Sequence, residues 1–294
     1  MYRSRTMSDV LSKLENQAKR FSKGQRRIAE FILASYDKAA FMTASRLGST
    51  VGVSESTVVR FAMDLGYDGY PQMQKALQEL VLNNLTSVQR MGVTNDRMDK
   101  KDILAEVLHG DAEKVRKTGE YISPVAFQNS VQAILKAKRI YLLGVRSASA
   151  LANFMGYYLN YMFDSVHIVT ASGTGEMFEK LVNVRSDDVV IAFSFPRYSS
   201  ATVKGAEYCR SVGATVIGLT NSNLSPLAQI CDHLLLAKSD MVSLVDSLVA
   251  PLSVVNALIV ALAAEREEAL EKTFGTLEKV WEENSVYEKR VDNP

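Results

Sequence analysis

The sequence has few of the features that would tie a protein to a membrane, a metal or an oxidising compartment. Among its 294 residues are only two cysteines, Cys209 and Cys231, with no CxxC spacing and no nearby histidine cluster. No disulfide framework and no metal site are therefore expected, and both cysteines are predicted to be small buried hydrophobic residues. Apolar runs fall well short of the roughly 20 residues that span a bilayer.

The N-terminal residues also lack the pattern of a secretory signal, because Met1 to Arg5 lead into a polar segment. We expect a cytoplasmic protein with no membrane partner. The net charge of +1 is small but unevenly distributed. Residues 1–80 carry twelve Lys/Arg against eight Asp/Glu, whereas the rest carries 22 against 25. A basic N-terminal part is typical of nucleic-acid binding, although ordinary surface variation also accounts for an excess of this size.

Three short helices are predicted in the N-terminal third. Ser22 opens an S-x-x-Q capping box, Thr43 can cap a very short second helix, and Ser54 can cap a third. Gly52 supplies a turn between the second and third helices, and Gly66 stands where the third should end. This spacing is typical of a helix-turn-helix, whose second helix enters the major groove of DNA.

The third helix should have one apolar face and one face open to a partner. Val58 and Phe61 lie on the apolar side, and Ser56 and Arg60 point away from it. Arg60 can contact either a guanine or a phosphate, and a helical hairpin for dimerisation fits the same spacing. The candidate DNA-binding residues are Thr43, Ser54, Ser56, Thr57 and Arg60.

The segment from Thr43 to Gly69 resembles the N-terminal domain of the RpiR family of bacterial regulators. The resemblance is carried by the VSESTVVRF core and the LGYDGY ending. It implies that Tyr70 begins the helix that closes this small domain. It also implies a DNA-reading region that contains Ser54, Ser56, Thr57 and Arg60.

A second domain should follow a polar linker at residues 83–100, so that residues 1–82 form the all-α DNA-binding domain and 101–294 the second one. Short β-rich runs alternate there with helical stretches: RIYLLG from Arg139, VHIVT from Val166, DVVIAF from Asp188, TVIGLT from Thr215 and DHLLLA from Asp232. This alternation predicts a five-stranded parallel sheet covered by helices on both faces. Ligands bind such sheets at the carboxyl ends of the strands.

Three loops at those strand ends have the composition of a ligand site. The loops at 144–149 and 194–200 each combine serines and an arginine with the start of a helix, which makes an anion site. The loop at 220–226 can hydrogen-bond sugar hydroxyls, and it fits a simple capped turn equally well. The candidate ligand-binding residues are Gly144, Arg146, Ser147, Ser149, Ser194, Arg197, Ser199, Ser200 and Thr220.

The core of this domain, at about residues 130–265, resembles the SIS, or sugar isomerase, domain, which implies a bound phosphosugar. RpiR-family regulators join the two modules in this order. The usual first-loop pattern, GxGxS, has Arg146 at its second glycine and Ala148 at its serine. In the second pattern, SxSGxT, the second serine and the glycine are replaced by Pro196 and Arg197, and the threonine by Ser199. Both arginines suit a phosphate or a carboxylated sugar acid.

Three functions remain open at this point. A sugar-phosphate isomerase needs a positioned base, and Glu176 is the only acid predicted near a ligand loop. A regulator without a ligand could use the α/β domain for assembly alone. We expect instead a regulator that binds operator DNA and a phosphorylated sugar, with no catalytic residue and no cofactor.

Two C-terminal features suggest how the chain assembles. A helix at about 245–264 is apolar around much of its circumference and should lie in the core or at a subunit interface; its apolar residues are Leu244, Leu248, Leu252, Val255, Leu258 and Ile259. A charged tail from Glu265 to Arg290 follows, and Trp281 is expected to dock it. A homodimer or homotetramer is expected, because groove-reading helices work best in two-fold pairs.

Overall fold

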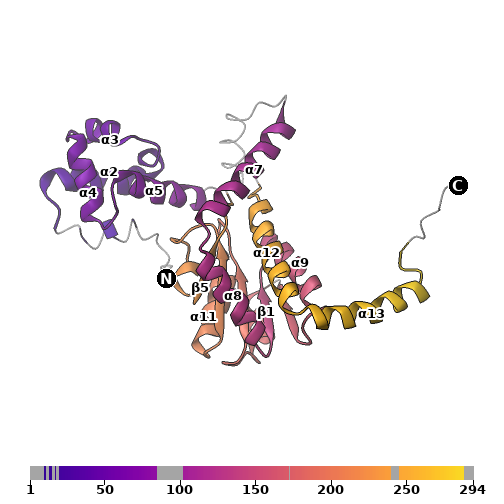
Figure 1. Ribbon diagram of the computed structural model, residues 1–294. Helices are drawn as coiled ribbons and strands as arrows, with labels where there is room; N and C mark the ends of the chain where they lie inside the picture. Colours follow the sequence, from indigo (N-terminus) through magenta and orange to yellow (C-terminus); the bar gives the residue numbers. More distant parts are fainter. Residues whose placement is uncertain are drawn as a thin grey trace. The chain divides into compact units, whose positions relative to one another are not determined.

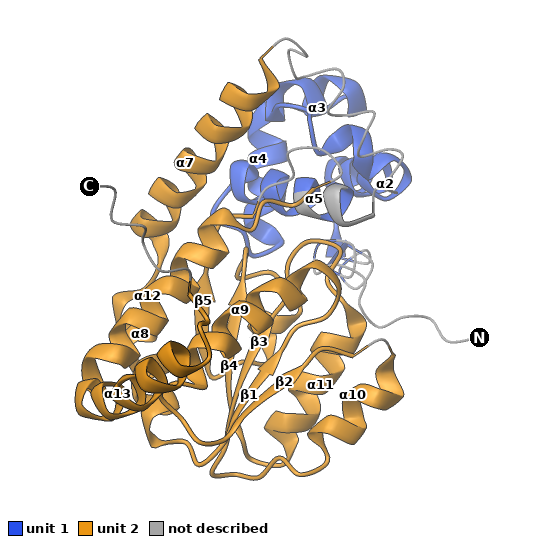
Figure 2. Ribbon diagram, turned by 90° about the vertical axis from the view of Figure 1, so that its right-hand side faces the viewer, with its two compact units in different colours: residues 1–97 blue, residues 98–294 orange. Residues whose placement is uncertain are grey.

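The chain forms two compact units, residues 1–97 and 98–294 (Figures 1 and 2). The computed structural model describes residues 10, 13, 14, 17, 20–84, 102–171, 173–239 and 245–287. The predicted linker therefore lies outside the described residues apart from its first two positions. Each unit has its own hydrophobic core, so each is described by itself.

The first unit is all-α, as predicted. Its helices are α2 (Lys23–Ala39), α3 (Ala44–Val51), α4 (Glu55–Asp64) and α5 (Tyr70–Asn84). The predicted capping box at Ser22 is present, with both of its hydrogen bonds formed. Aromatic packing joins the segment just before α2 to α4, because the rings of Phe21 and Phe61 meet edge to face at 5.2 Å between centroids.

The second unit contains the predicted five-stranded parallel sheet. Its strands are β1 (Ile140–Leu143), β2 (Val166–Val169), β3 (Val189–Phe193), β4 (Thr215–Thr220) and β5 (His233–Leu236). They are arranged in the order β2-β1-β3-β4-β5, and every pair is parallel. The chain direction across the sheet reverses between β1 and β3, and such a reversal opens a crevice at the carboxyl ends of the strands.

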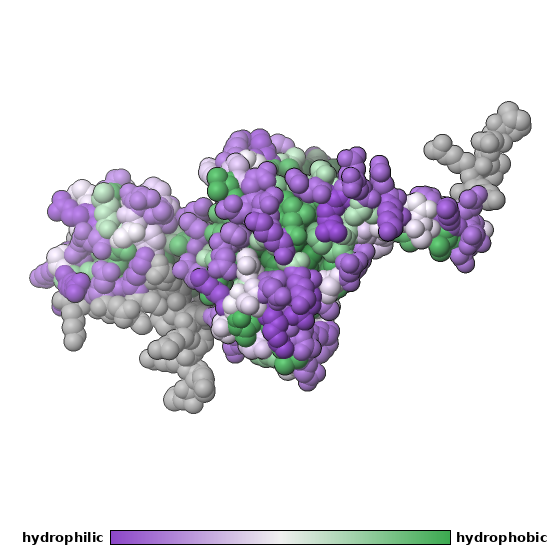
Figure 3. Space-filling model, turned by 60° about the horizontal axis from the view of Figure 1, so that its bottom comes forward, coloured by the Kyte–Doolittle hydropathy of each residue, from purple (hydrophilic) through white to green (hydrophobic). Residues whose placement is uncertain are grey.

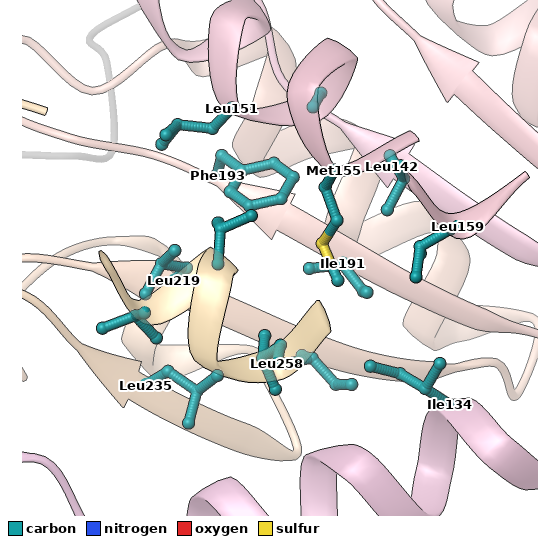
Figure 4. Packing of buried hydrophobic residues seen from close by; sticks show 14 of the residues in the cluster. Ile134, Leu142, Leu151, Met155, Leu159, Ile191, Phe193, Leu219, Leu235 and Leu258 are labelled. Carbon is teal, nitrogen blue, oxygen red and sulfur yellow. The ribbon is translucent and has the colours of Figure 1, made fainter. Parts of the chain in front are cut away.

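Helices cover both faces of the sheet, which confirms the predicted layering. One face packs on α8 (Pro124–Lys136), α9 (Ser149–Leu159) and α12 (Val249–Glu265), and the other on α10 (Thr174–Leu181) and α11 (Ser200–Ser211). Alternation along β3 divides the two cores: Ile191 and Phe193 enter the first, while Val190 and Ala192 enter the second. Figure 4 shows Phe193 and Ile191 packed among Met155, Leu258 and their neighbours.

Helices α7 (Ile103–Tyr121) and α13 (Glu267–Glu283) complete the unit, with short 3-10 turns η2 (Arg146–Ala148) and η3 (Leu227–Gln229). Helix α13 leaves α12 at a bend of 95° and projects from the body of the unit (Figure 1). None of its residues is buried. No single helix in the described part of the chain could span a membrane; the bent pair α12 and α13 reaches the required length and composition only together.

Three expectations about single residues need correction or completion. Cys209 is buried as predicted, but Cys231 is only partly buried. Trp281 contacts Phe274 and Tyr287 of its own segment, and Phe274 in turn contacts Tyr161, just after α9. Leu244 lies outside the described residues.

Candidate functional sites

The turn between α3 and α4 is built on two glycines. A methyl group at Gly48 would lie 2.8 Å from the carbonyl oxygen of Val53, so only glycine permits this close approach. The same two residues are joined by a hydrogen bond from the Val53 amide to the Gly48 carbonyl, at 2.9 Å. Gly52 has a positive φ of 71° and ends α3. Together these contacts fix the direction in which α4 leaves the turn.

The start of α4 is a cluster of hydroxyl groups. Ser54 Oγ accepts a hydrogen bond from the Thr57 amide at 3.3 Å, and it lies 2.9 Å from Ser56 Oγ and 2.8 Å from Thr57 Oγ1. Thr43 Oγ1 likewise accepts from the Arg46 amide, at 3.2 Å. Ser54 and Thr43 thus act as helix caps, a role that requires no DNA.

The outward face of α4 is exposed as the sequence predicts. Val58 and Phe61 are buried, whereas Ser56, Arg60 and Met63 are exposed. The Arg60 side chain makes no hydrogen bond or ion pair with any described residue. An exposed face with an arginine that has no partner, on the second helix of such a turn, fits the geometry of a groove-reading helix.

Arg27 adds a basic group that the sequence pattern did not single out. Its Nη1 lies 3.1 Å from the point where a side chain on Gly52 would begin, so the guanidinium covers the turn between α3 and α4. The only sequence signal for Arg27 is the pair Arg26-Arg27 near the start of α2. By itself such a pair indicates no more than an exposed helix face.

Tight packing fixes the first loop at the carboxyl edge of the sheet. A side chain on Gly144 would meet the Ala148 carbonyl oxygen at 2.8 Å, which explains the glycine. Ser149 Oγ donates a hydrogen bond to the Arg146 carbonyl at 2.6 Å. Arg146 and Ser147 are exposed, and the Arg146 side chain has no partner among the described residues.

The second loop leads into a helix whose amino end is left open. Ser199 is the N-cap residue of α11, yet its side chain makes no capping hydrogen bond. The amides of the first turn are therefore available to an anion. Tyr198 ties this loop to the third one, because its hydroxyl donates to Asn221 Oδ1 at 2.8 Å.

Three buried hydroxyls beside these loops have no hydrogen-bond partner among the residues that the structure describes. They belong to Ser194, Thr202 and Thr220, which are 2%, 1% and 0% exposed. Ser194 follows β3 and Thr220 ends β4, and alternation turns both toward the face that α11 covers. Thr202 lies in the first turn of α11. A buried hydroxyl without a partner costs free energy, so such a group marks a candidate site for a ligand.

The sequence predicted Ser194 and Thr220 but not Thr202. A threonine inside a helix carries no signal of its own, and only the fold brings it to the edge of the sheet. In the third loop, Ser222 and Ser225 form the simple capped turn that was one of its two predicted roles. Their hydroxyls accept hydrogen bonds from the amides of Leu224 and Ala228, at 3.1 and 3.2 Å.

Both loop arginines have a strained backbone. Arg146 has a φ of 58° and Arg197 a φ of 59°; of the described residues other than glycine, only Ser285 also has a positive φ. A left-handed conformation costs a residue with a side chain about 1–3 kcal/mol. These are the positions where the two loop patterns ordinarily have glycine, so the arginines keep the loop shape and add a guanidinium to each loop.

The candidate general base is engaged elsewhere. The Glu176 carboxylate forms an ion pair with Lys180 at 2.8 Å on the exposed side of α10. Two of the histidines lie on strands, where His233 is the first residue of β5 and His167 stacks on Tyr141 of β1. His109 is exposed on α7.

Helix α7 is anchored to the segments that follow β5. Asp111 Oδ1 accepts from Ser247 Oγ at 2.6 Å and from Lys114 Nζ at 3.1 Å, and Lys114 is only 8% exposed. Thr118 Oγ1 accepts from the Lys238 amide at 2.9 Å. Side-chain bonds of α7 thus hold the chain on both sides of residues 240–244.

Two family models match the chain. The model described as "Helix-turn-helix domain, rpiR family" matches residues 8–84, and the SIS domain model matches residues 133–261. An uncharacterized HTH-type transcriptional regulator of Haemophilus influenzae is 26% identical over 242 residues, which cover 77% of this chain and 79% of that protein.

Solved structures agree with this assignment. The sugar isomerase domain of an RpiR transcription factor from Sphaerobacter thermophilus has a TM-score of 0.57 and 28% identity, covering 60% of this chain and 97% of that one. The Vibrio vulnificus NanR protein, solved in complex with ManNAc-6P, has a TM-score of 0.56 and 21% identity, covering 92% and 98%; at this identity it supports the fold alone. The chain therefore belongs to the RpiR family of helix-turn-helix transcriptional regulators with a SIS domain.

Proposed function

We propose that a phosphorylated sugar or sugar acid, bound at the carboxyl edge of the sheet, controls how tightly this regulator binds its operator. The observation that carries the proposal is the group of three buried, unpartnered hydroxyls beside the uncapped start of α11. A phosphate accepts several hydrogen bonds at once and is favoured at the positive end of a helix dipole. The proposal fits the Vibrio NanR protein, which was solved with a phosphosugar.

The proposed ligand site joins the first two loops and the end of β4. Gly144 shapes the first loop. In the second loop, Arg197 adds a positive charge, Ser199 leaves the amino end of α11 uncapped, and Ser200 adds an exposed hydroxyl. Its direct contacts are proposed to be Arg146, Ser147, Ser149, Ser194, Arg197, Ser199, Ser200, Thr202 and Thr220.

On the DNA side, the proposed domain is residues 1–82 with α4 as its reading helix. Ser56, Thr57 and Arg60 are the proposed groove contacts, while Ser54 and Thr43 hold the amino ends of α4 and α3 and reach phosphates from there. The second proposed domain, residues 101–294, contains the effector site.

We propose that the chain acts as a homodimer or homotetramer. Helix α12 buries one side in the core but exposes Val260, which is 68% exposed, on the other. A helix that is apolar all round is normally covered on every side, so a second copy is the proposed cover. Ligand control then requires about 1–3 kcal/mol of preference between two arrangements of the subunits.

The test is a titration of dye-labelled DNA from upstream of the gene, followed by anisotropy at fixed salt. Salt is held constant because phosphate contacts make the affinity steeply dependent on ionic strength. The expected result is specific binding that one class of phosphosugar shifts by about tenfold or more, the effect of about 1.4 kcal/mol.

Two variants separate the two sites. Ser194→Ala should abolish the response to the effector and leave DNA affinity unchanged, because Ser194 lies in the other unit from α4. Lys204→Gln, on the exposed side of α11, should change neither. Binding that prefers the operator but ignores every phosphosugar, in parent and variants alike, would contradict the effector role. Interconversion of a sugar phosphate by the purified protein would instead favour an isomerase.

A further inference from the structure

We infer that the effector carries two anionic groups: a phosphate bound at residues 194–200 and a carboxylate bound by Arg146. The effector class is thereby narrowed to phosphorylated sugar acids. This inference rests on the proposed function, because it assumes that a phosphosugar binds at this edge of the sheet.

The two arginines occupy matching places in neighbouring loops. Arg146 follows β1 and Arg197 follows β3, and both have the same left-handed backbone, with φ of 58° and 59°. Strands β1 and β3 pair directly, with Leu143 opposite Ala192, so the loops leave the sheet side by side. The strand order reverses between these two loops, which is where ligands bind in sheets of this type. One ligand bound at this point could therefore contact both loops.

The second loop is equipped for a phosphate. It combines the uncapped amino end of α11 with the unpartnered, buried hydroxyls of Ser194 and Thr202, and Thr220 adds a third hydroxyl from β4. Hydroxyl and amide donors suit the three outer oxygens of a phosphate ester, which accept hydrogen bonds from several directions.

The first loop has fewer such donors and suits a different group. The Ser149 hydroxyl already donates to the Arg146 carbonyl at 2.6 Å, and Ala148 has no hydroxyl to offer. What remains is the exposed guanidinium of Arg146, which has no partner among the described residues, with the Ser147 hydroxyl beside it. A guanidinium is planar and pairs with a carboxylate through two parallel hydrogen bonds.

The charge of the two loops also favours a ligand with a carboxylate. Residues 144–149 and 194–200 contain two arginines and no acidic residue. A neutral sugar with one phosphate would leave the Arg146 guanidinium facing hydroxyls alone, whereas a carboxylate would satisfy it. The strained backbone at Arg146 fits this account, because glycine would give the same loop without strain but also without charge.

The test compares ligands that differ in one group. The full-length protein is titrated by calorimetry with hexose 6-phosphates, the matching hexonate 6-phosphates and the unphosphorylated hexonates, each of gluco, manno and galacto configuration. At least one hexonate 6-phosphate should bind about tenfold or more tightly than its hexose 6-phosphate, as one charge-assisted pair predicts.

Variants assign each group to its loop. Arg146→Gln should reduce that preference to below about twofold, because the carboxylate loses its partner. Arg146→Gly should also reduce the preference to below about twofold. That result would show that the preference depends on the charge of this side chain and not on the shape of the backbone. Ser194→Ala should weaken both phosphorylated classes equally and keep the preference. Lys204→Gln is the matched control.

The outcomes separate this inference from the function on which it rests. If hexose 6-phosphates bind and shift operator affinity but hexonate 6-phosphates bind no tighter, the carboxylate site is wrong and the phosphosugar effector stands. A preference that survives in Arg146→Gln also overturns the assignment. If no phosphorylated ligand of either class binds, the proposed function fails together with the inference.

Discussion

Arg60 is the side chain on α4 best placed to distinguish a base contact from a phosphate contact. Arg60→Ala should weaken operator binding by about 1–3 kcal/mol, measured by anisotropy. If Arg60 reads a base, binding to random DNA stays unchanged. If it holds a phosphate, both DNAs lose affinity and the slope of log affinity against log salt becomes shallower by about 0.9.

The control for Arg60 is Lys38→Ala, which removes the same charge at the carboxyl end of α2. Equal losses in the two variants would mean that only the overall charge of the unit matters. The reading role of α4 would then be wrong.

Tyr70 should make the free energy of unfolding of the first unit depend on pH in the alkaline range. Its hydroxyl donates to the Met42 carbonyl at 2.7 Å, and burial raises the pKa of Tyr70 to about 12. Tyr70→Phe should lower the free energy of unfolding by about 1 kcal/mol at neutral pH, measured by urea denaturation.

The difference between parent and Tyr70→Phe should then shrink with rising pH. In the unfolded chain the pKa of this hydroxyl is near its ordinary value of 10.0, whereas the folded chain holds the proton up to about pH 12. The unfolded state therefore binds fewer protons between these values, and the stabilisation from Tyr70 falls across that window. A constant difference up to about pH 11 would contradict the assignment.

At the level of single residues, helix starts could be predicted from the sequence because of capping chemistry. Ser22, Thr43 and Ser54 begin their helices as expected, because a hydroxyl before an amphipathic run has a local physical role. Thr202 and Arg27 could not be found in this way. Their importance comes from neighbours distant in sequence, and local patterns contain no information about those neighbours.

Among the elements, the strands were predictable because buried parallel strands are short, continuous apolar runs, as at Val189–Phe193. Their order was not. The pairing of β1 with both β2 and β3 arises from crossovers, and it alone places the loops of Arg146 and Arg197 side by side. The ligand residues themselves remain predictions.

Helix α7 depends on Asp111 for its attachment to the rest of the second unit. Asp111→Ala removes the acceptor for both the Lys114 ammonium and the Ser247 hydroxyl. Because Lys114 is mostly buried, we expect a loss of about 2–3 kcal/mol in the free energy of unfolding.

The double variant Asp111→Ala, Lys114→Met should regain part of this loss, since it also removes the charge that was left without a partner. Both free energies come from urea denaturation followed by circular dichroism. Strictly additive losses would mean that the two side chains do not interact energetically.

For the whole molecule, the outward side of α12 should govern self-association. Val260→Glu places a charge on that apolar side and should convert the proposed oligomer to a monomer in sedimentation experiments, without unfolding, because Val260 is already exposed within one chain. Val212→Glu, at the carboxyl end of α11, is the matched control. A parent protein that is monomeric at all concentrations would refute the proposed interface.

Helix α13 has none of its side chains buried, and apolar residues lie among polar ones on the arm at the right of Figure 3. It also contains Trp281, the single tryptophan of the chain. The emission spectrum of the whole protein therefore reports from this one helix. Any partner that covers α13 should shift that emission to shorter wavelength, which gives the molecule a built-in optical probe that needs no label.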